Sequence, residues 1–179
     1  MDQERHWRRG PLSFFMGIVA GVLIAQMRFQ LTETELFGEY FLNQYAMLPV
    51  NREKLFFYVG GYRLSQYLAF VCIGFLAQAP LLLTALLFLA GMLWGSMTGI
   101  SILQLGMKGF VICLTGLFPQ ILFYVPAFGW VFLWTYCGGV NRKKYMIFAF
   151  LGLFFLLFGI AAEACINPEI IRQILRKIS

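Results

Sequence analysis

Residues 145–164 have the sequence YMIFAFLGLFFLLFGIAAEA, an apolar run whose first charged side chain is Glu163. A stretch of about 20 apolar residues is long enough to cross the hydrocarbon core of a bilayer as an α-helix. Lipid offers no partner for backbone N–H and C=O groups, and a helix pairs these groups within one segment. This run therefore predicts a membrane-spanning helix and an all-α fold class.

Four further apolar stretches precede this run, and each predicts another span. The chain of 179 residues is 60% hydrophobic and 12% charged, whereas soluble domains carry about 25% charged residues. This surplus of apolar surface predicts a single transmembrane domain in the lipid bilayer, without a separate soluble domain. We expect a polytopic helical bundle with about five spans, at residues 11–27, 55–77, 80–105, 109–137 and 145–164.

Two segments outside these spans combine an apolar face with a polar face. Residues 32–48 open with a Thr-x-x-Glu capping pattern and then repeat large apolar residues at helical spacing. Residues 167–179 carry isoleucines and a leucine on one helical face and basic residues on the other. Both patterns predict amphipathic helices at the membrane interface. The first helix would either cover the bundle or provide a docking surface.

Glycines recur at every fourth position in two of the predicted spans. Gly17 and Gly21 form one such pair in the first span, and Gly91, Gly95 and Gly99 form a longer series in the third. This spacing gathers small residues on one helical face, where another helix can approach closely. We expect all five glycines to pack against neighbouring helices.

Prolines interrupt the fourth predicted span, residues 109–137, at Pro119 and Pro126. Proline lacks a backbone N–H and bends or breaks a helix. The segment is therefore expected to be either a tilted, kinked span or two half-helices that partly re-enter the membrane. The broken form is favoured.

The formal net charge of +6 comes from short basic clusters near the ends of spans. They form no stripe interleaved with exposed aromatics, so we expect no nucleic-acid partner. The positive-inside rule places the clusters at residues 5–9 and 142–144 in the cytoplasm. Four predicted spans separate them, which agrees with a cytoplasmic N-terminus. Five spans put the C-terminus outside, whereas the basic residues at 172–177 favour a cytoplasmic C-terminus by the same rule.

Two ionisable residues, Arg63 and Glu163, lie inside a predicted span or at its end. An ionisable group within the membrane is costly and is by default a candidate functional site. Glu163 would either take part in a proton or ion relay, pair with Arg63, or reach the headgroups from a helix that Asn167 and Pro168 cap and end. A buried pair would be mainly structural, because each charge neutralises the other.

The sequence offers no nucleophile with an orienting base, no carboxylate pair and no phosphate-binding glycine loop. Its four cysteines form no Cys-x-x-Cys pair, and its only histidine, His6, lies in the N-terminal tail. We therefore expect no enzymatic activity, no cofactor and no metal site.

Several short motifs together resemble the stage II sporulation protein M family of bacterial membrane proteins. One is the opening span, Phe15–Ala25, and another is the glycine-rich third span with the turn Gln-Leu-Gly-Met-Lys-Gly that follows it. The two most specific motifs are Phe118–Pro126 and Glu163–Pro168. The residues of the turn and of these two motifs that carry the similarity are Gly106, Gly109, Pro119, Gln120, Pro126, Glu163, Asn167 and Pro168.

The chain departs from the family after the first proline, where it has Gln120-Ile121 and many members carry a His-Asn or similar polar pair. If that pair contributes to a polar site, the site is reduced in this chain. Gln120 is more consistent with an interhelical hydrogen bond than with a substrate path.

The resemblance implies a non-enzymatic membrane scaffold for engulfment during sporulation. Its expected location is the bacterial cytoplasmic membrane, in particular the mother-cell septal or engulfing membrane. Its implied partners are two peptidoglycan hydrolases, an amidase and a lytic transglycosylase, and self-association is left open. A transporter or permease subunit is the alternative, because a broken helix and charges in the membrane can line a substrate site.

Overall fold

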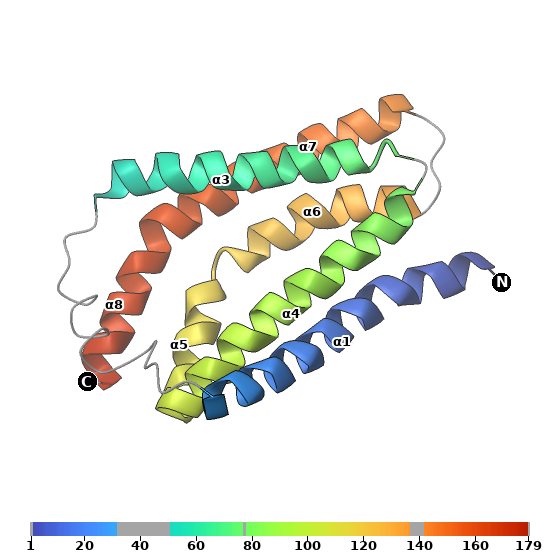
Figure 1. The fold of residues 1–179 in the computed structure, drawn as a ribbon. Helices are drawn as coiled ribbons and strands as arrows, with labels where there is room; N and C mark the ends of the chain where they lie inside the picture. The colour runs from blue at the N-terminus through green and yellow to red at the C-terminus, as the bar shows by residue number, and fades with distance from the viewer. Residues whose placement is uncertain (1, 32–50, 77, 137–141, 179) are drawn as a thin grey trace. The chain divides into compact units, whose positions relative to one another are not determined.

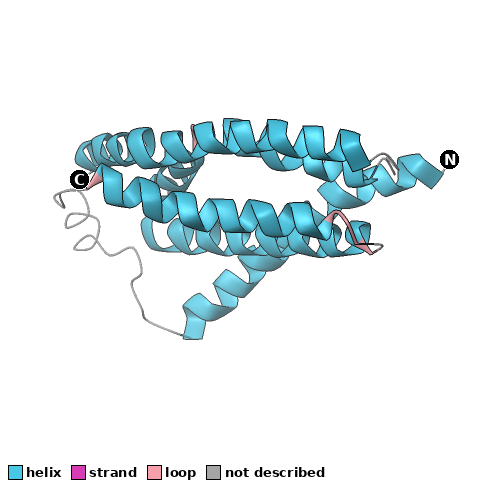
Figure 2. Cartoon of the chain, turned by 90° about the horizontal axis from the view of Figure 1, so that it is seen from above, coloured by secondary structure: helices cyan, strands magenta, loops and turns pink. Residues whose placement is uncertain are grey.

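The computed structural model describes residues 2–31, 51–76, 78–136 and 142–178, and all regular structure in this part is helical (Figures 1 and 2). The elements are α1 (Asp2–Leu31), α3 (Arg52–Ile73), α4 (Ala79–Leu105), α5 (Met107–Leu117), α6 (Ile121–Tyr136), α7 (Arg142–Ala161), the π-helix η1 (Ala162–Ile166) and α8 (Asn167–Ile178). The all-α prediction is confirmed for the described residues. The amphipathic helix predicted at residues 32–48 lies outside them.

Three helical segments of the described chain are long and apolar enough to cross a membrane: Gly10–Arg28, Ala79–Leu105 and Lys143–Leu175. The bent pair α5 and α6 adds a fourth if it is counted as one span. Helix α3 does not join this group, because its 22 residues include Arg63 and Gln66. The chain is thus a multi-pass membrane protein by these helices, and the count of five spans stays a prediction.

The chain divides into two compact units. Unit 1 comprises residues 1–7, 50–83 and 117–168, and unit 2 comprises residues 8–49, 84–116 and 169–179. Helices α3, α6, α7 and η1 belong to unit 1, whereas unit 2 holds most of α1, α4, α5 and α8.

In unit 2, α1 packs in parallel against α4. The hydroxyl of Ser13 donates to the carbonyl of Thr84 at 2.9 Å, and further along both helices Gly17 faces the main chain of Phe88. A Cβ on Gly17 would collide with that main chain. The two helices approach this closely because the glycine has no side chain.

The remaining predicted packing glycines lie in the same interface. Gly21 of α1 faces the main chain of α4, and Gly91 and Gly95 of α4 face the main chain of α1 in return. Gly99 meets the side chain of Ala25. All five glycines singled out by their spacing therefore contribute to one parallel helix pair.

The connection from α4 to α5 uses the two glycines of the predicted turn. Gly106 has a φ of 61°, a left-handed backbone conformation that side chains disfavour. Gly109 then lies against the carbonyl of Ser101, and the Ser101 hydroxyl contacts the Cys113 sulfur at 3.0 Å. Helix α5 therefore folds back along the end of α4.

In unit 1, α3 and α6 both run antiparallel to α7. On the α3 side, the Tyr67 hydroxyl donates to the carbonyl of Ala149, and Gly60 lies against Ile160. On the α6 side, the Trp130 and Phe148 rings stack at 5.4 Å, and Phe123 stacks on Phe158 nearer the start of α6. The buried core of this unit consists of Tyr67, Ala127, Val131, Tyr145, Leu156 and Ile160.

The fourth predicted span consists of two helices, α5 and α6, separated by residues 118–120. Pro119 lies in this gap, and the peptide bond that precedes it is cis. Pro126 lies inside α6 and does not end it, so a break at this second proline is not confirmed. How this bent pair lies in a membrane stays a prediction.

The last helix does not end at Asn167 and Pro168. In one of the three alternatives for Glu163 these two residues cap and end the last span, but helical structure continues from α7 through η1 into α8. Asn167 donates its backbone N–H to the carbonyl of Ala162, five residues earlier. Pro168 follows this widened turn and occupies the first turn of α8, where a missing N–H is tolerated.

Candidate functional site

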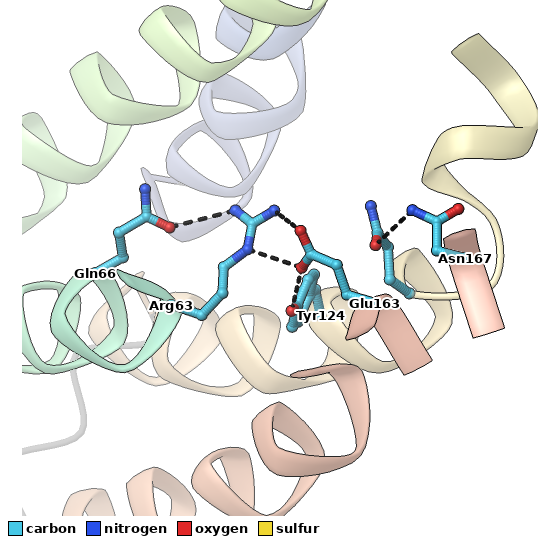
Figure 3. A network of polar contacts seen from close by, with 6 residues as sticks. Arg63, Gln66, Tyr124, Glu163 and Asn167 are labelled. Atoms are coloured by element: carbon cyan, nitrogen blue, oxygen red, sulfur yellow. Dashed lines mark hydrogen bonds and ion pairs between the residues drawn. The ribbon is translucent and has the colours of Figure 1, made fainter. Parts of the chain in front are cut away.

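Polar side chains from three parts of unit 1 meet in an otherwise apolar set of helices (Figure 3). We call this group the polar cluster and define it as Arg63, Gln66, Gln120, Tyr124, Glu163 and Asn167. Within it, Gln120 and Tyr124 are four residues apart, and so are Glu163 and Asn167. This spacing places each pair on one face of its helical segment.

Arg63 and Glu163 form the centre of the polar cluster. Arg63 Nε donates to Glu163 Oε2 at 3.0 Å, and Arg63 Nη2 donates to Glu163 Oε1 at 2.8 Å. This is the bidentate geometry in which a planar guanidinium matches a carboxylate. The side chains are 29% and 17% exposed, respectively, so the pair is largely withdrawn from the protein surface.

Tyr124 of α6 supports the same carboxylate from another side. Its hydroxyl donates to Glu163 Oε2 at 2.5 Å, and its ring lies 5.1 Å from the guanidinium carbon of Arg63, within cation–π range. The ring fits against α7 because Gly159 has no side chain there. Tyr124 therefore contacts both charges and links α6 to the ion pair.

Three amide side chains extend the polar cluster, with Gln66 on one side of the ion pair and Gln120 and Asn167 on the other. Gln66, one turn along α3, accepts a hydrogen bond from Arg63 Nη1 at 3.3 Å. Asn167 donates to Gln120 Oε1 at 3.3 Å, which joins the start of α8 to the gap before α6. Gln120 is among the buried polar residues of the described chain. The Gln120 bond is the interhelical kind expected for this residue, whereas the Gln66 bond lies within α3.

The π-helix η1 carries Glu163 between the two helices that it contacts. A π-turn has one more residue per hydrogen-bonded ring than an α-turn, and single π-turns occur often at functional positions. Glu163 and Asn167 lie at the start and directly after the end of η1. Their side-chain bonds to α3, α6 and the gap before α6 hold both ends of this turn.

The geometry suits a neutral, structural junction. Arg63 and Glu163 carry opposite formal charges, and both carboxylate oxygens already accept hydrogen bonds from Arg63 or Tyr124. Removing either charge would leave the other in a low-dielectric setting, where an unpaired ion is strongly unfavourable. In the described residues, no group of three His, Cys, Asp or Glu side chains is placed to hold a metal ion.

The structure brings some predicted site residues together and separates others. Arg63 and Glu163 form the ion pair that was one of three predicted alternatives for Glu163. Gln120 and Asn167 also belong to the polar cluster. Pro119 and Pro168 directly adjoin its members in sequence, and Pro126 follows Tyr124 by two residues. The packing glycines and the turn glycines Gly106 and Gly109 lie in unit 2.

Tyr124 was missed by the sequence analysis. A tyrosine in an apolar segment is most often an interfacial residue, so its identity alone gave no reason to select it. Its position four residues after Gln120 was the available signal, because this spacing puts the two polar groups on the same helical face.

Comparisons with protein-family models, with curated proteins and with solved structures find no match to this chain.

Proposed function

We propose that this protein is a non-enzymatic membrane scaffold that holds peptidoglycan hydrolases at a bacterial membrane. The proposal rests on the resemblance to the stage II sporulation protein M family. If it holds, the protein acts in the cytoplasmic membrane of the mother cell, where the septal membrane engulfs the forespore. Its partners would be a peptidoglycan amidase and a lytic transglycosylase.

One observation carries the proposal. The two most specific motifs of the resemblance, Phe118–Pro126 and Glu163–Pro168, contact each other through side chains in the structure. Tyr124 of the first motif donates to Glu163 of the second, and Asn167 of the second donates to Gln120 of the first. Motifs that are matched separately in sequence but meet in space support a shared fold more strongly than either motif does alone.

The closed ion pair favours a scaffold over a relay. A proton or ion relay needs a carboxylate that can exchange its partner, whereas both oxygens of Glu163 accept bonds from Arg63 or Tyr124. The pair joins α3 to η1, and Tyr124 adds α6. A rigid junction of this kind is what a scaffold requires in order to present a fixed surface.

The parallel packing of α1 and α4 supports the predicted five-span arrangement. Two parallel helices that both cross a bilayer start on the same side, so the chain between them returns across the membrane. Helix α3 is the one described helix in that connection. Its 22 residues extend for about 33 Å, which is enough to cross the hydrocarbon core.

Directions within unit 1 support the same arrangement. Because α3 and α6 both run antiparallel to α7, the C-terminal ends of α3 and α6 lie at the same end of unit 1 as the N-terminal end of α7. The Tyr145 hydroxyl marks this level, since it donates to Val71 near the end of α3. Helix α4 begins at Ala79, shortly after α3 ends. The starts of α1, α4 and α7 would then share one side, which the basic residues near the N-terminus and at 142–144 identify as cytoplasmic.

A transporter or permease subunit is the second candidate. It is favoured by the gap at residues 118–120 between α5 and α6, because broken helices expose backbone groups that can line a substrate site. The polar cluster adjoins this gap through Gln120.

The test is co-purification of the tagged full-length chain from sporulating cells of its native host. Proteins would be cross-linked in the cells, extracted in mild detergent and identified by mass spectrometry. A similarly tagged polytopic protein of the same membrane is the control bait. We expect an amidase and a lytic transglycosylase to be enriched over this control.

The charge-free double variant Arg63→Leu/Glu163→Leu sharpens this test, because it keeps the pair neutral. A scaffold should retain its hydrolase partners in this variant, provided that the variant accumulates like the wild type. Recovery of an ATP-hydrolysing subunit with no wall hydrolase would instead support the transporter and count against the scaffold.

A further inference from the structure

We propose that α3 is a conditional span, whose crossing of the membrane depends on Glu163, a residue 100 positions further along the chain than Arg63. The N-terminal end of α3, at Asn51–Lys54, would reach its outer side only in a chain whose α7 and η1 are in place. This inference rests on the five-span arrangement proposed above and adds a dependence between two of its spans.

The composition of α3 is the first support. Among the described helices with at least 18 residues, α1, α4 and α7 contain or belong to segments apolar enough to span, and α3 does not. Arg63, Ser65 and Gln66 interrupt its apolar sequence near the middle. An arginine at the centre of a helix is among the most unfavourable residues for insertion into a bilayer.

The position of Arg63 makes this penalty hard to avoid. Its Cα lies about 15 Å from either end of α3, given a rise of 1.5 Å per residue. A side chain that snorkels relieves the penalty best near a helix end. Arg63 therefore needs a partner at its own depth, and in the described chain its acidic partner is Glu163.

The partner is supplied by the segment best suited to insert unaided. The most apolar 18-residue stretch of Lys143–Leu175 has a mean hydropathy of 2.4, the highest among the three candidate spans. It places Glu163 where both carboxylate oxygens accept from Arg63 at 2.8 and 3.0 Å. Helix α7 would thus enter the membrane without help, whereas α3 is stable there once α7 and η1 have arrived.

Failure of α3 to cross would have a defined consequence for α4. If the connection between α1 and α4 stayed on one side, α4 would start on the side where α1 ends and would run antiparallel to α1. The glycine interface of Gly17 with Phe88 and of Gly91 with Phe14 is a parallel one and could not form. One ion pair in unit 1 would therefore control the packing of a helix pair in unit 2.

The test maps membrane sides in the full-length chain with single cysteines. Cys72, Cys113, Cys137 and Cys165 are replaced by serine or alanine, and either Lys54→Cys or Gln78→Cys is introduced. A membrane-impermeant thiol reagent is applied to intact and to opened cells. In the parent background, we expect Lys54→Cys to be labelled from outside and Gln78→Cys to be labelled only in opened cells.

Glu163→Leu should lower outside labelling of Lys54→Cys about tenfold, because α3 then carries an unpaired arginine. Arg63→Leu/Glu163→Leu should restore it, since neither charge remains. The labelling of each variant is divided by the amount of its chain that remains in the membranes after an alkaline wash. Degradation of the Glu163→Leu chain, together with normal accumulation of the double variant, would also support the dependence of α3 on Glu163.

Unchanged outside labelling of the Glu163→Leu chain would overturn the inference, as would loss of both variants from the membrane. Labelling of Lys54→Cys and Gln78→Cys from the same side in the parent background would overturn the five-span arrangement itself. A failure of the dependence and a failure of the underlying topology therefore give different results.

Discussion

Tyr67 of α3 and Tyr145 of α7 form a reciprocal pair in which each hydroxyl donates to a carbonyl of the other helix. Tyr67 donates to Ala149 and Tyr145 donates to Val71, both at 2.7 Å. A phenol buried in an apolar setting needs such a partner. Because the two bonds lie at different levels of one antiparallel helix pair, together they fix the register of α3 against α7.

Tyr67→Phe removes one of these hydrogen bonds and keeps the ring. We expect the free energy of unfolding to fall by about 1 kcal/mol, as for a typical intramolecular hydrogen bond. Tyr145→Phe should have a similar effect, and the double variant should show coupling between the two effects, because the bonds lie about one helical turn apart on the same helix pair. Thermal unfolding of the purified chain in detergent measures both. Tyr58→Phe, at a ring that is 76% exposed, is the matched control and should change little.

Gly21→Ala is expected to separate α1 from α4. The added Cβ would lie within the main chain of Met92 and Ser96, and neither backbone can move without shifting its whole helix. We expect a loss of about 2 kcal/mol or more in unfolding free energy, as for overpacking of a core. Disulfide cross-linking between Ser13→Cys and Thr84→Cys should fall in the same variant, since those positions are joined across this interface in the wild type.

Gly61→Ala is the control for this substitution. Gly61 lies inside α3, and a Cβ there would meet nothing within 4 Å. Alanine is the better helix former by about 1 kcal/mol, so this variant should be as stable as the wild type or slightly more stable. Equal losses for Gly21→Ala and Gly61→Ala would show that helix propensity, not the close approach of α1 and α4, determines the effect.

Much of the fold could be predicted because lipid permits few alternatives. The apolar sequences of α1, α4 and α7 predict helices. The four-residue spacing of Gly91, Gly95 and other glycines indicates which helical face packs. That spacing could not show that α1 and α4 are partners or that they are parallel. These facts depend on which glycine faces match in space, and each face alone is compatible with many partners.

The polar cluster was harder to predict for physical reasons. Arg63 and Glu163 were conspicuous because charges are rare in spans, so their pairing could be considered from the sequence. The π-turn has no comparable signature, and a proline at position 168 ordinarily indicates a helix end. The helix continues because the wider turn before Pro168 changes the hydrogen-bonding register. Tyr124 was hidden because its role depends on tertiary contacts with Glu163 and Arg63.

Tyr124→Phe tests how the polar cluster is supported from α6. The variant loses the hydroxyl that donates to Glu163 but keeps the ring beside Arg63. Because the acceptor is charged, we expect a loss of about 1.5–3 kcal/mol in unfolding free energy. Tyr62→Phe, at an exposed ring on α3, is the control. Equal stability of the Tyr124→Phe chain and the wild type would contradict a supporting role for the hydroxyl.

The ion pair itself predicts a non-additive cycle of variants. Arg63→Gln and Glu163→Gln should each lower the free energy of unfolding by about 3 kcal/mol, because each leaves one charge without its partner. Arg63→Gln/Glu163→Gln should lose much less than the sum, since two amides can hydrogen-bond without any net charge. Unfolding of all four chains in the same detergent gives the coupling energy directly. If the single losses simply add, Arg63 and Glu163 do not stabilise the fold as a pair, and the ion pair could not hold α3 in the membrane.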